Sequence, residues 1–277
     1  LEEHKNALAR RLGISKRGEE LDQALGSDFE RVFLSAYGKQ TCATLKEQYR
    51  MAPAIGSLVS TCFYDNVLEN GKKDSDVPDI YTGLPETLKA CVTWLDTASL
   101  PHTYHNPGKS GSLSNRAEAD VIIGLLQDLS NDETFMNSEA IQKCLDSNTQ
   151  AIGVICMYAE QKRLLRQKFN QEIWSDGFKD IVKIDTVDSY QGKENRIIIL
   201  SLTRSDKQHS PGFLRAPNRI NVAMSRAMDR LLIVGNADIW KGNNKELPLG
   251  SVVRYMTECG QEAGYTFLAA EQGGKQK

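Results

Sequence analysis

Two arginines seven residues apart, Arg219 and Arg226, are the first candidates for chemistry in this chain. Pro217 suits the first turn of a helix, and a helix over 217–228 would carry both guanidiniums on one side. Two forked guanidiniums facing one direction would clamp phosphate oxygens. The apolar residues of the segment fall on a different side and are expected to pack on a sheet: Ile220, Ala223, Met224 and Ala227. Taken alone, such a pair is more often a solvated helix face, because surface arginines are common.

Two further segments combine polar residues with turn formers. The first, LKEQYRMAP at 45–53, holds Gln48, Tyr49 and Arg50. The second, IDTVDSYQGKENRIIILSLTRS at 184–205, places Gly192 and Glu194 just before an apolar run. Gly192 permits a tight backbone turn at the edge of a sheet. Hydroxyl or backbone donors for a nucleic-acid phosphate are available in the same segment at Thr186 and Ser189.

Together with GFLRAPNRINVAMSRAMDRLLIVGN at 212–236, these segments resemble, in order and separation, three signature segments of superfamily 1 helicases of the up-frameshift type. A weaker fourth match is IGVICMYAEQKRLL at 152–165, and the resemblance covers about residues 28–240. The chain is therefore similar to the second, C-terminal RecA-like domain of such a helicase. The implied fold is α/β, a RecA-like three-layer domain with a mostly parallel sheet flanked by helices, plus an N-terminal helical segment.

The resemblance also implies residue roles. Arg226 becomes the arginine finger and Arg50 a second sensor of the γ-phosphate, while Tyr49 stacks on the adenine. Glu194 accepts hydrogen bonds from the ribose hydroxyls. The rest of the nucleotide site is expected at Gln48, Gly192 and Arg219, and the strand-binding residues at Thr186, Ser189 and Tyr158.

The sequence departs from the family pattern at two places. Lys193 stands where the family usually has arginine, which keeps the charge and loses the fork. Cys156, Met157 and Tyr158 stand where a Thr-Pro-Tyr run is common, so the hydroxyl that would grip phosphate is missing. Tyr158 keeps an aromatic ring for contact with a base or sugar. Gln161 and Arg163 of the next helix could compensate, or could belong to an exposed helix face.

No phosphate loop of the pattern G-x-x-x-x-G-K-[ST] occurs in the chain. The nearest string, from Gly13 to Gly18, continues into Glu19 and Glu20, which would repel phosphate. We therefore expect ATP with Mg²⁺ as the cofactor, with the phosphate loop and the metal supplied by a first RecA-like domain upstream in the same polypeptide. No metal site is expected in this chain, and the isolated chain should not hydrolyse ATP. The other expected partner is single-stranded RNA or DNA, with 5′-to-3′ movement implied by the family.

Short apolar runs alternate with amphipathic segments, which is typical of parallel βαβ units. Strands are predicted at 89–95, 151–157, 181–184, 196–202 and 230–235, and helices at 53–64, 115–130, 159–173, 217–228 and 250–260. An exposed loop is predicted at 97–114. The predicted division is a helical segment at 1–40, the second RecA-like domain at 41–270 and a disordered tail at 271–277.

Composition sets the outer limits on function. The 277 residues carry a formal net charge of −2, so any nucleic-acid groove must be local. The six cysteines form no C-x-x-C pair, which argues against a zinc site. No apolar run approaches 18 residues, so we expect a protein of the cytoplasm or nucleus with no membrane partner.

Two alternatives remain open from the sequence. The full protein could be a catalytically incomplete, helicase-like module that binds nucleic acid or acts as a scaffold. An unrelated α/β enzyme would need a nucleophile and base, and the four histidines lie in polar or loop contexts without such partners: His4, His102, His105 and His209.

Overall fold

The computed structural model describes residues 45–78, 85–108, 111–190 and 192–271, with a few positions between 32 and 43. The chain divides into two compact units, residues 1–45 and residues 46–277. In the first unit the described helix is α4 (Ala36–Thr41). Most of the helical segment predicted at 1–40, and the predicted tail beyond residue 271, lie outside the described residues.

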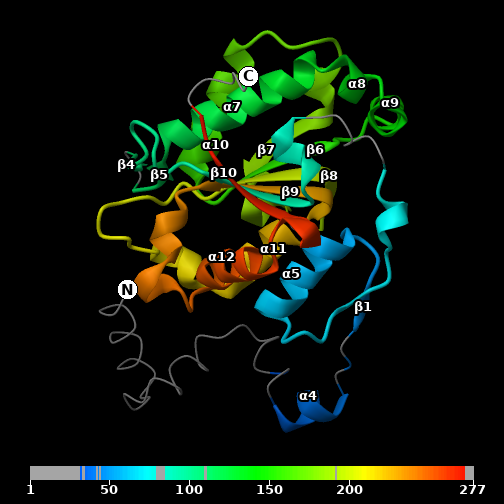
Figure 1. The fold of residues 1–277 in the computed structure, drawn as a ribbon, viewed down its shortest axis with the longest axis vertical. Coiled ribbons are helices and arrows are strands. Elements are labelled where there is room, and N and C mark those ends of the chain that lie inside the picture. Colours follow the sequence, from blue (N-terminus) through cyan, green and yellow to red (C-terminus); the bar gives the residue numbers. More distant parts are fainter. Residues whose placement is uncertain are drawn as a thin grey trace. The chain divides into compact units, whose positions relative to one another are not determined.

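A parallel sheet of six strands forms the centre of the second unit, in the order β10-β3-β9-β8-β6-β7 (Figure 1). Its strands are β3 (Val92–Asp96), β6 (Ile152–Cys156), β7 (Val182–Thr186), β8 (Asn195–Ser201), β9 (Ala227–Gly235) and β10 (Tyr265–Ala269). Two short pairs lie outside it: β1 (Glu47–Gln48) with β2 (Glu69–Asn70), and β4 (Asn106–Pro107) with β5 (Leu113–Ser114). The predicted α/β class with a parallel sheet is confirmed.

Helices cover both faces of this sheet, which makes three layers (Figure 1). One face carries α5 (Pro53–Phe63), α11 (Pro217–Met224) and α12 (Pro248–Cys259). The other carries α7 (Arg116–Asn131), α8 (Glu133–Met136), α9 (Glu139–Asp146) and α10 (Ala159–Gln171). A further short helix, α6 (Glu86–Lys89), precedes β3.

The central strand β8 shows why the sheet is buried. Side chains alternate along a strand, so Ile198 and Leu200 enter the core under α5, α11 and α12, whereas Ile197 and Ile199 enter the core under α7 and α10. All four are fully buried. A strand that is apolar at consecutive positions is therefore stable only in the middle of a three-layer domain.

Local signals set several helix starts. Proline occupies the first turn of α5, α11 and α12, where its missing N–H costs nothing. Helix α7 begins after Asn115, whose side chain accepts a hydrogen bond from the Glu118 amide at 3.1 Å.

Some predicted elements differ from the observed ones. The helix predicted at 217–228 ends at Met224, and strand β9 already begins at Ala227. The helix predicted at 159–173 ends at Gln171, and Ile173 beyond it is 95% exposed. The predicted loop at 97–114 contains the β4–β5 pair, and β10 was not predicted.

Candidate nucleotide site and strand-binding edge

Two predicted site residues directly precede neighbouring strands. Glu194 comes just before β8 and Arg226 just before β9, and these parallel strands pair Asn195 with Ala227. The Asn195 amide donates to the Arg226 carbonyl at 3.1 Å. The sheet therefore places Glu194 and Arg226 side by side at its amino edge, although they are 32 positions apart in the sequence.

Arg50 reaches the same edge from the segment between β1 and α5. Its Nε forms an ion pair with the Glu194 carboxylate, and its Nη1 donates to the Ser225 carbonyl at 3.3 Å. The backbone beside it is tied to β9, because the Ala52 amide donates to the Met228 carbonyl at 2.7 Å. The side chains of Arg50 and Glu194 are 37% and 45% exposed, so the pair can be reached by a ligand.

Arg226 is held by backbone carbonyls. Its Nε donates to the Val222 carbonyl at 3.0 Å and its Nη1 to the Lys193 carbonyl at 3.3 Å. Burial lowers the pKa of Arg226, and the neighbouring Arg50 charge lowers it further, while the Glu194 charge opposes both effects. Two guanidiniums beside one carboxylate leave an excess positive charge, which an anionic ligand would neutralise.

Three other predicted nucleotide residues lie on the strands and turns around this cluster. The Gln48 amide is used within the protein: Nε2 donates to the Met51 carbonyl and to Asn70 Oδ1 at 3.0 and 2.8 Å, and Oε1 accepts from the Met51 amide at 2.7 Å. Gln48 therefore fixes the backbone next to Arg50.

Tyr49 is 67% exposed, which leaves its ring accessible for stacking. Gly192 has a φ of +78°, a left-handed backbone conformation that favours glycine in the turn before Glu194.

Arg219 does not join Arg226, so the prediction that both share one helical face is wrong. Helix α11 ends at Met224 and leads from the carboxyl end of β8 to the amino end of β9. Arg219 stands near its first end and Arg226 beyond its last, and an eight-residue helix is about 12 Å long. Arg219 instead pairs with Asp188 at 3.3 Å and lies over the Phe213 ring at 5.2 Å.

The predicted strand-binding residues follow the carboxyl ends of the strands. Thr186 ends β7 in register with Cys156 of β6, and its hydroxyl lies 3.2 Å from that of Ser189. Tyr158 follows β6, and its ring packs at 4.6 Å from that of Phe213. Burial raises the pKa of the Tyr158 phenol. Since β8 has seven residues, this edge is about 20 Å from the cluster of Arg50, Glu194 and Arg226.

A buried polar network supports this carboxyl edge and was not predicted. Gln161, for which the sequence left open a strand contact or an exposed helix face, is fully buried and bonds Asn115 and Ser201. Glu118 accepts hydrogen bonds from the Ser201 hydroxyl and the Thr203 amide at 2.7 and 2.8 Å. The spacing of Asn115 and Glu118 is that of a capping motif at a helix start, which is the signal that could have located the network.

The donor set fits the anionic end of a nucleotide, and Glu194 is the one carboxylate described in this cluster. Among the described residues, no group of three or more His, Cys, Asp or Glu side chains could hold a metal ion. Asp185 binds Lys162 at 3.3 Å, and Asp188 binds Arg219. Within the same residues, no helix is long and apolar enough to cross a membrane.

Comparison with known proteins identifies the class. Residues 25–238 match the family model described as "AAA domain". Helicase sen1 of Schizosaccharomyces pombe is 31% identical over 206 residues, 74% of this chain and 11% of its own length. ATP-dependent helicase upf1 of the same organism is 30% identical over 200 residues, 69% of this chain and 19% of its length. Putative helicase MOV-10 of Gallus gallus is 28% identical over 251 residues, 83% and 24% of the two chains.

The chain belongs to the AAA domain family and is a helicase-family domain homologous to superfamily 1 helicases. Within that class, the resemblance to the C-terminal RecA-like domain of the up-frameshift type is confirmed. The chain spans between about a tenth and a quarter of the length of these three relatives.

Proposed function

We propose that this domain is the C-terminal motor domain of an ATP-dependent helicase or translocase that moves 5′-to-3′ on single-stranded RNA or DNA. A first RecA-like domain of the same polypeptide would supply the phosphate loop and hold Mg²⁺. The observation that carries the proposal is the meeting of Arg50, Glu194 and Arg226 at the amino edge of β8 and β9. These residues come from three distant segments, so their meeting depends on the whole fold.

Each residue of this cluster has a distinct proposed role. Arg226 acts as the arginine finger that stabilises charge on the γ-phosphate during transfer, and Arg50 senses the same phosphate. Glu194 holds Arg50 with one oxygen. A carboxylate has about four lone-pair sites, so it can accept from ribose hydroxyls at the same time. Tyr49, with its exposed ring, stacks on the adenine.

Strand contact is proposed at the opposite edge of the sheet. Thr186 and Ser189 present hydroxyls to phosphate, and Tyr158 offers a partly exposed ring. Arg219 fits this edge better than the nucleotide site, because it lies over Phe213, the ring that also packs on Tyr158.

One short segment connects the two edges. Residues 187–194 lead from the carboxyl end of β7 to the amino end of β8, and η4 (Val187–Tyr190) forms their first half. Tyr190 is fully buried there and donates to the Lys183 carbonyl at 3.1 Å. A displacement of Glu194 on nucleotide binding would therefore also shift the position of Ser189. Closure on ATP and reopening after hydrolysis would then change the grip on the strand.

The test is Arg226→Ala in the full-length protein. Strand-stimulated ATP hydrolysis should fall by about a thousandfold or more, because an arginine finger acts mainly in the transition state. Affinity for single-stranded RNA or DNA should change little. Arg254→Ala is the matched control, since it removes an exposed arginine of α12 that pairs with Glu246. Unchanged turnover in Arg226→Ala would refute the finger assignment.

One observation favours the non-catalytic scaffold instead. Cys156, the last residue of β6, stands where the family commonly has a threonine hydroxyl, and its side chain is buried. A scaffold would bind single strands without hydrolysis. Wild-type full-length protein that binds RNA and DNA but shows no ATPase with either would favour this alternative.

A further inference from the structure

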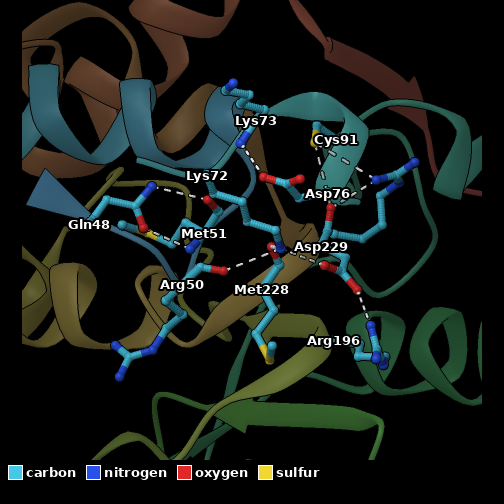
Figure 2. Close-up of polar contacts among 11 residues, drawn as sticks. Gln48, Arg50, Met51, Lys72, Lys73, Asp76, Cys91, Arg196, Met228 and Asp229 are labelled. Carbon is cyan, nitrogen blue, oxygen red and sulfur yellow. Dashed lines mark hydrogen bonds and ion pairs between the residues drawn. The ribbon is translucent and has the colours of Figure 1, made fainter. Parts of the chain in front are cut away.

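Lys72 is a partly buried lysine with three acceptors around its ammonium group. Nζ donates to Asp229 Oδ1 at 3.0 Å, to the Met228 carbonyl at 3.3 Å and to the Arg50 carbonyl at 3.4 Å (Figure 2). The lysine side chain is 11% exposed and that of Asp229 is 0% exposed. An ammonium group has three donors, and here each has an oxygen to bind.

The location of Lys72 follows from the β1–β2 pair. The Gly71 amide donates to the Gln48 carbonyl at 2.8 Å, which brings the chain after β2 alongside the chain after β1. Lys72 is the next residue, so its side chain extends toward Arg50 and β9. The other oxygen of Asp229 accepts from Arg196 Nη1 at 2.9 Å, which fixes the carboxylate that receives Lys72.

Arg50 is therefore held through both its side chain and its backbone. Its guanidinium lies against Glu194, while its carbonyl is bound by Lys72. In Figure 2 the Arg50 side chain points away from Lys72 and Asp229. Lys72 thus acts on Arg50 through the backbone and stays apart from the proposed phosphate position.

We infer that Lys72, anchored by Asp229, is a positioning residue that sets the backbone of Arg50 so that its guanidinium meets the γ-phosphate. This inference rests on the proposed nucleotide role of Arg50. Position matters here because a displacement of about 1 Å at a group that binds the transition state can cost a large part of the rate.

The experiment is strand-stimulated ATP hydrolysis by the full-length protein carrying Lys72→Met. Methionine keeps most of the length and loses the donors, and Asp229 retains Arg196. We expect kcat to fall about tenfold, the scale of a lost hydrogen bond to a charged group, with KM for ATP changed less than about twofold. Lys73→Met is the matched control, because Lys73 is exposed and its bond to Asp76 uses the backbone amide.

A double variant separates positioning from general destabilisation. If Lys72 acts through Arg50, Lys72→Met should have little further effect in an Arg50→Ala background. An equal loss in both backgrounds, or activity equal to Lys73→Met, would overturn the inference. Lys72→Gln keeps an amide donor and serves as the second variant if Lys72→Met does not fold.

The outcomes also distinguish this inference from the proposed function. Normal hydrolysis by Arg50→Ala alone would refute the sensor role of Arg50, and the inference about Lys72 depends on that role. Impaired hydrolysis by Arg50→Ala together with normal hydrolysis by Lys72→Met would leave the sensor in place and reject only the positioning role.

Discussion

Two buried carboxylates in this domain have very different surroundings. Asp229 faces the cations of Lys72 and Arg196, whereas the hydrogen bonds of Glu118 come from the neutral Ser201 hydroxyl and Thr203 amide. Burial raises the pKa of Glu118 from 4.5 to about 8, although both hydrogen bonds lower it. At neutral pH, Glu118 is therefore a protonated, neutral member of its network.

The raised pKa of Glu118 predicts a pH dependence of stability. The folded state keeps a proton that the unfolded chain releases, so the free energy of unfolding falls as pH rises from 4.5 to about 8 and then levels off. In Glu118→Gln, which can accept the same two hydrogen bonds, this decline should shrink by an amount on the order of a few kcal/mol. Denaturant unfolding of both proteins at about pH 5 and about pH 9 measures it. Equal declines in both proteins would contradict the prediction.

At the scale of elements, the segment 187–194 depends on a close approach to β6. A Cβ placed on Gly153 would lie 2.6 Å from Asn195 Oδ1, 2.7 Å from Ile198 Cδ1 and 2.7 Å from Tyr190 Oη. No real Cβ tolerates such distances, so glycine is needed in the middle of this buried strand. One of these neighbours, Tyr190, lies in the segment that leads from the strand edge to Glu194, and the other two belong to β8.

Gly153→Ala should therefore lower the free energy of unfolding by about 1–3 kcal/mol through overpacking. One of the three clashing atoms is the Tyr190 hydroxyl, so Tyr190→Phe in the same chain should recover part of the loss. The measurement is denaturant unfolding of the two single variants and the double variant. A double variant whose loss equals the sum of the single losses would show that the crowding is elsewhere.

The boundary between α11 and β9 could not be predicted from the spacing of apolar residues. Residues 217–228 have a helical spacing of apolar positions, and Ile220, Ala223, Met224 and Ala227 are indeed all fully buried. Yet Ala227 is buried as the first residue of a strand. Burial was predicted correctly from hydrophobicity, whereas the chain direction at Arg226 depends on pairing with β8.

At the scale of the whole molecule, the proposed function gives this domain one part of a nucleotide site. It contributes guanidiniums and a carboxylate at the amino edge of its sheet, and its sequence contains no phosphate loop. In the proposed roles the cluster would contact only the distal phosphate and the sugar, which are too few contacts to orient water and metal for hydrolysis.

The isolated chain of residues 1–277 should consequently show no ATP hydrolysis above background, with or without single-stranded RNA or DNA. The full-length protein assayed in parallel is the positive control, and the isolated Arg226→Ala chain sets the background. Strand-stimulated hydrolysis by the purified wild-type chain, absent from its Arg226→Ala form, would mean that these residues complete a site by themselves.

The sequence by itself determined the α/β class, most strand positions and the residue types of the site. Hydrophobic periodicity, turn-forming residues and apolar runs are properties of residues that are neighbours along the chain. The resemblance assigned Arg50 and Glu194 to one nucleotide site, and the folded sheet brings the two together across 144 positions. The tertiary structure alone decided that Arg219 lies at the far end of α11 from Arg226, that Gln161 is buried, and that Lys72 holds Arg50. These outcomes depend on which strands are neighbours and where helices stop, and packing of distant segments sets both.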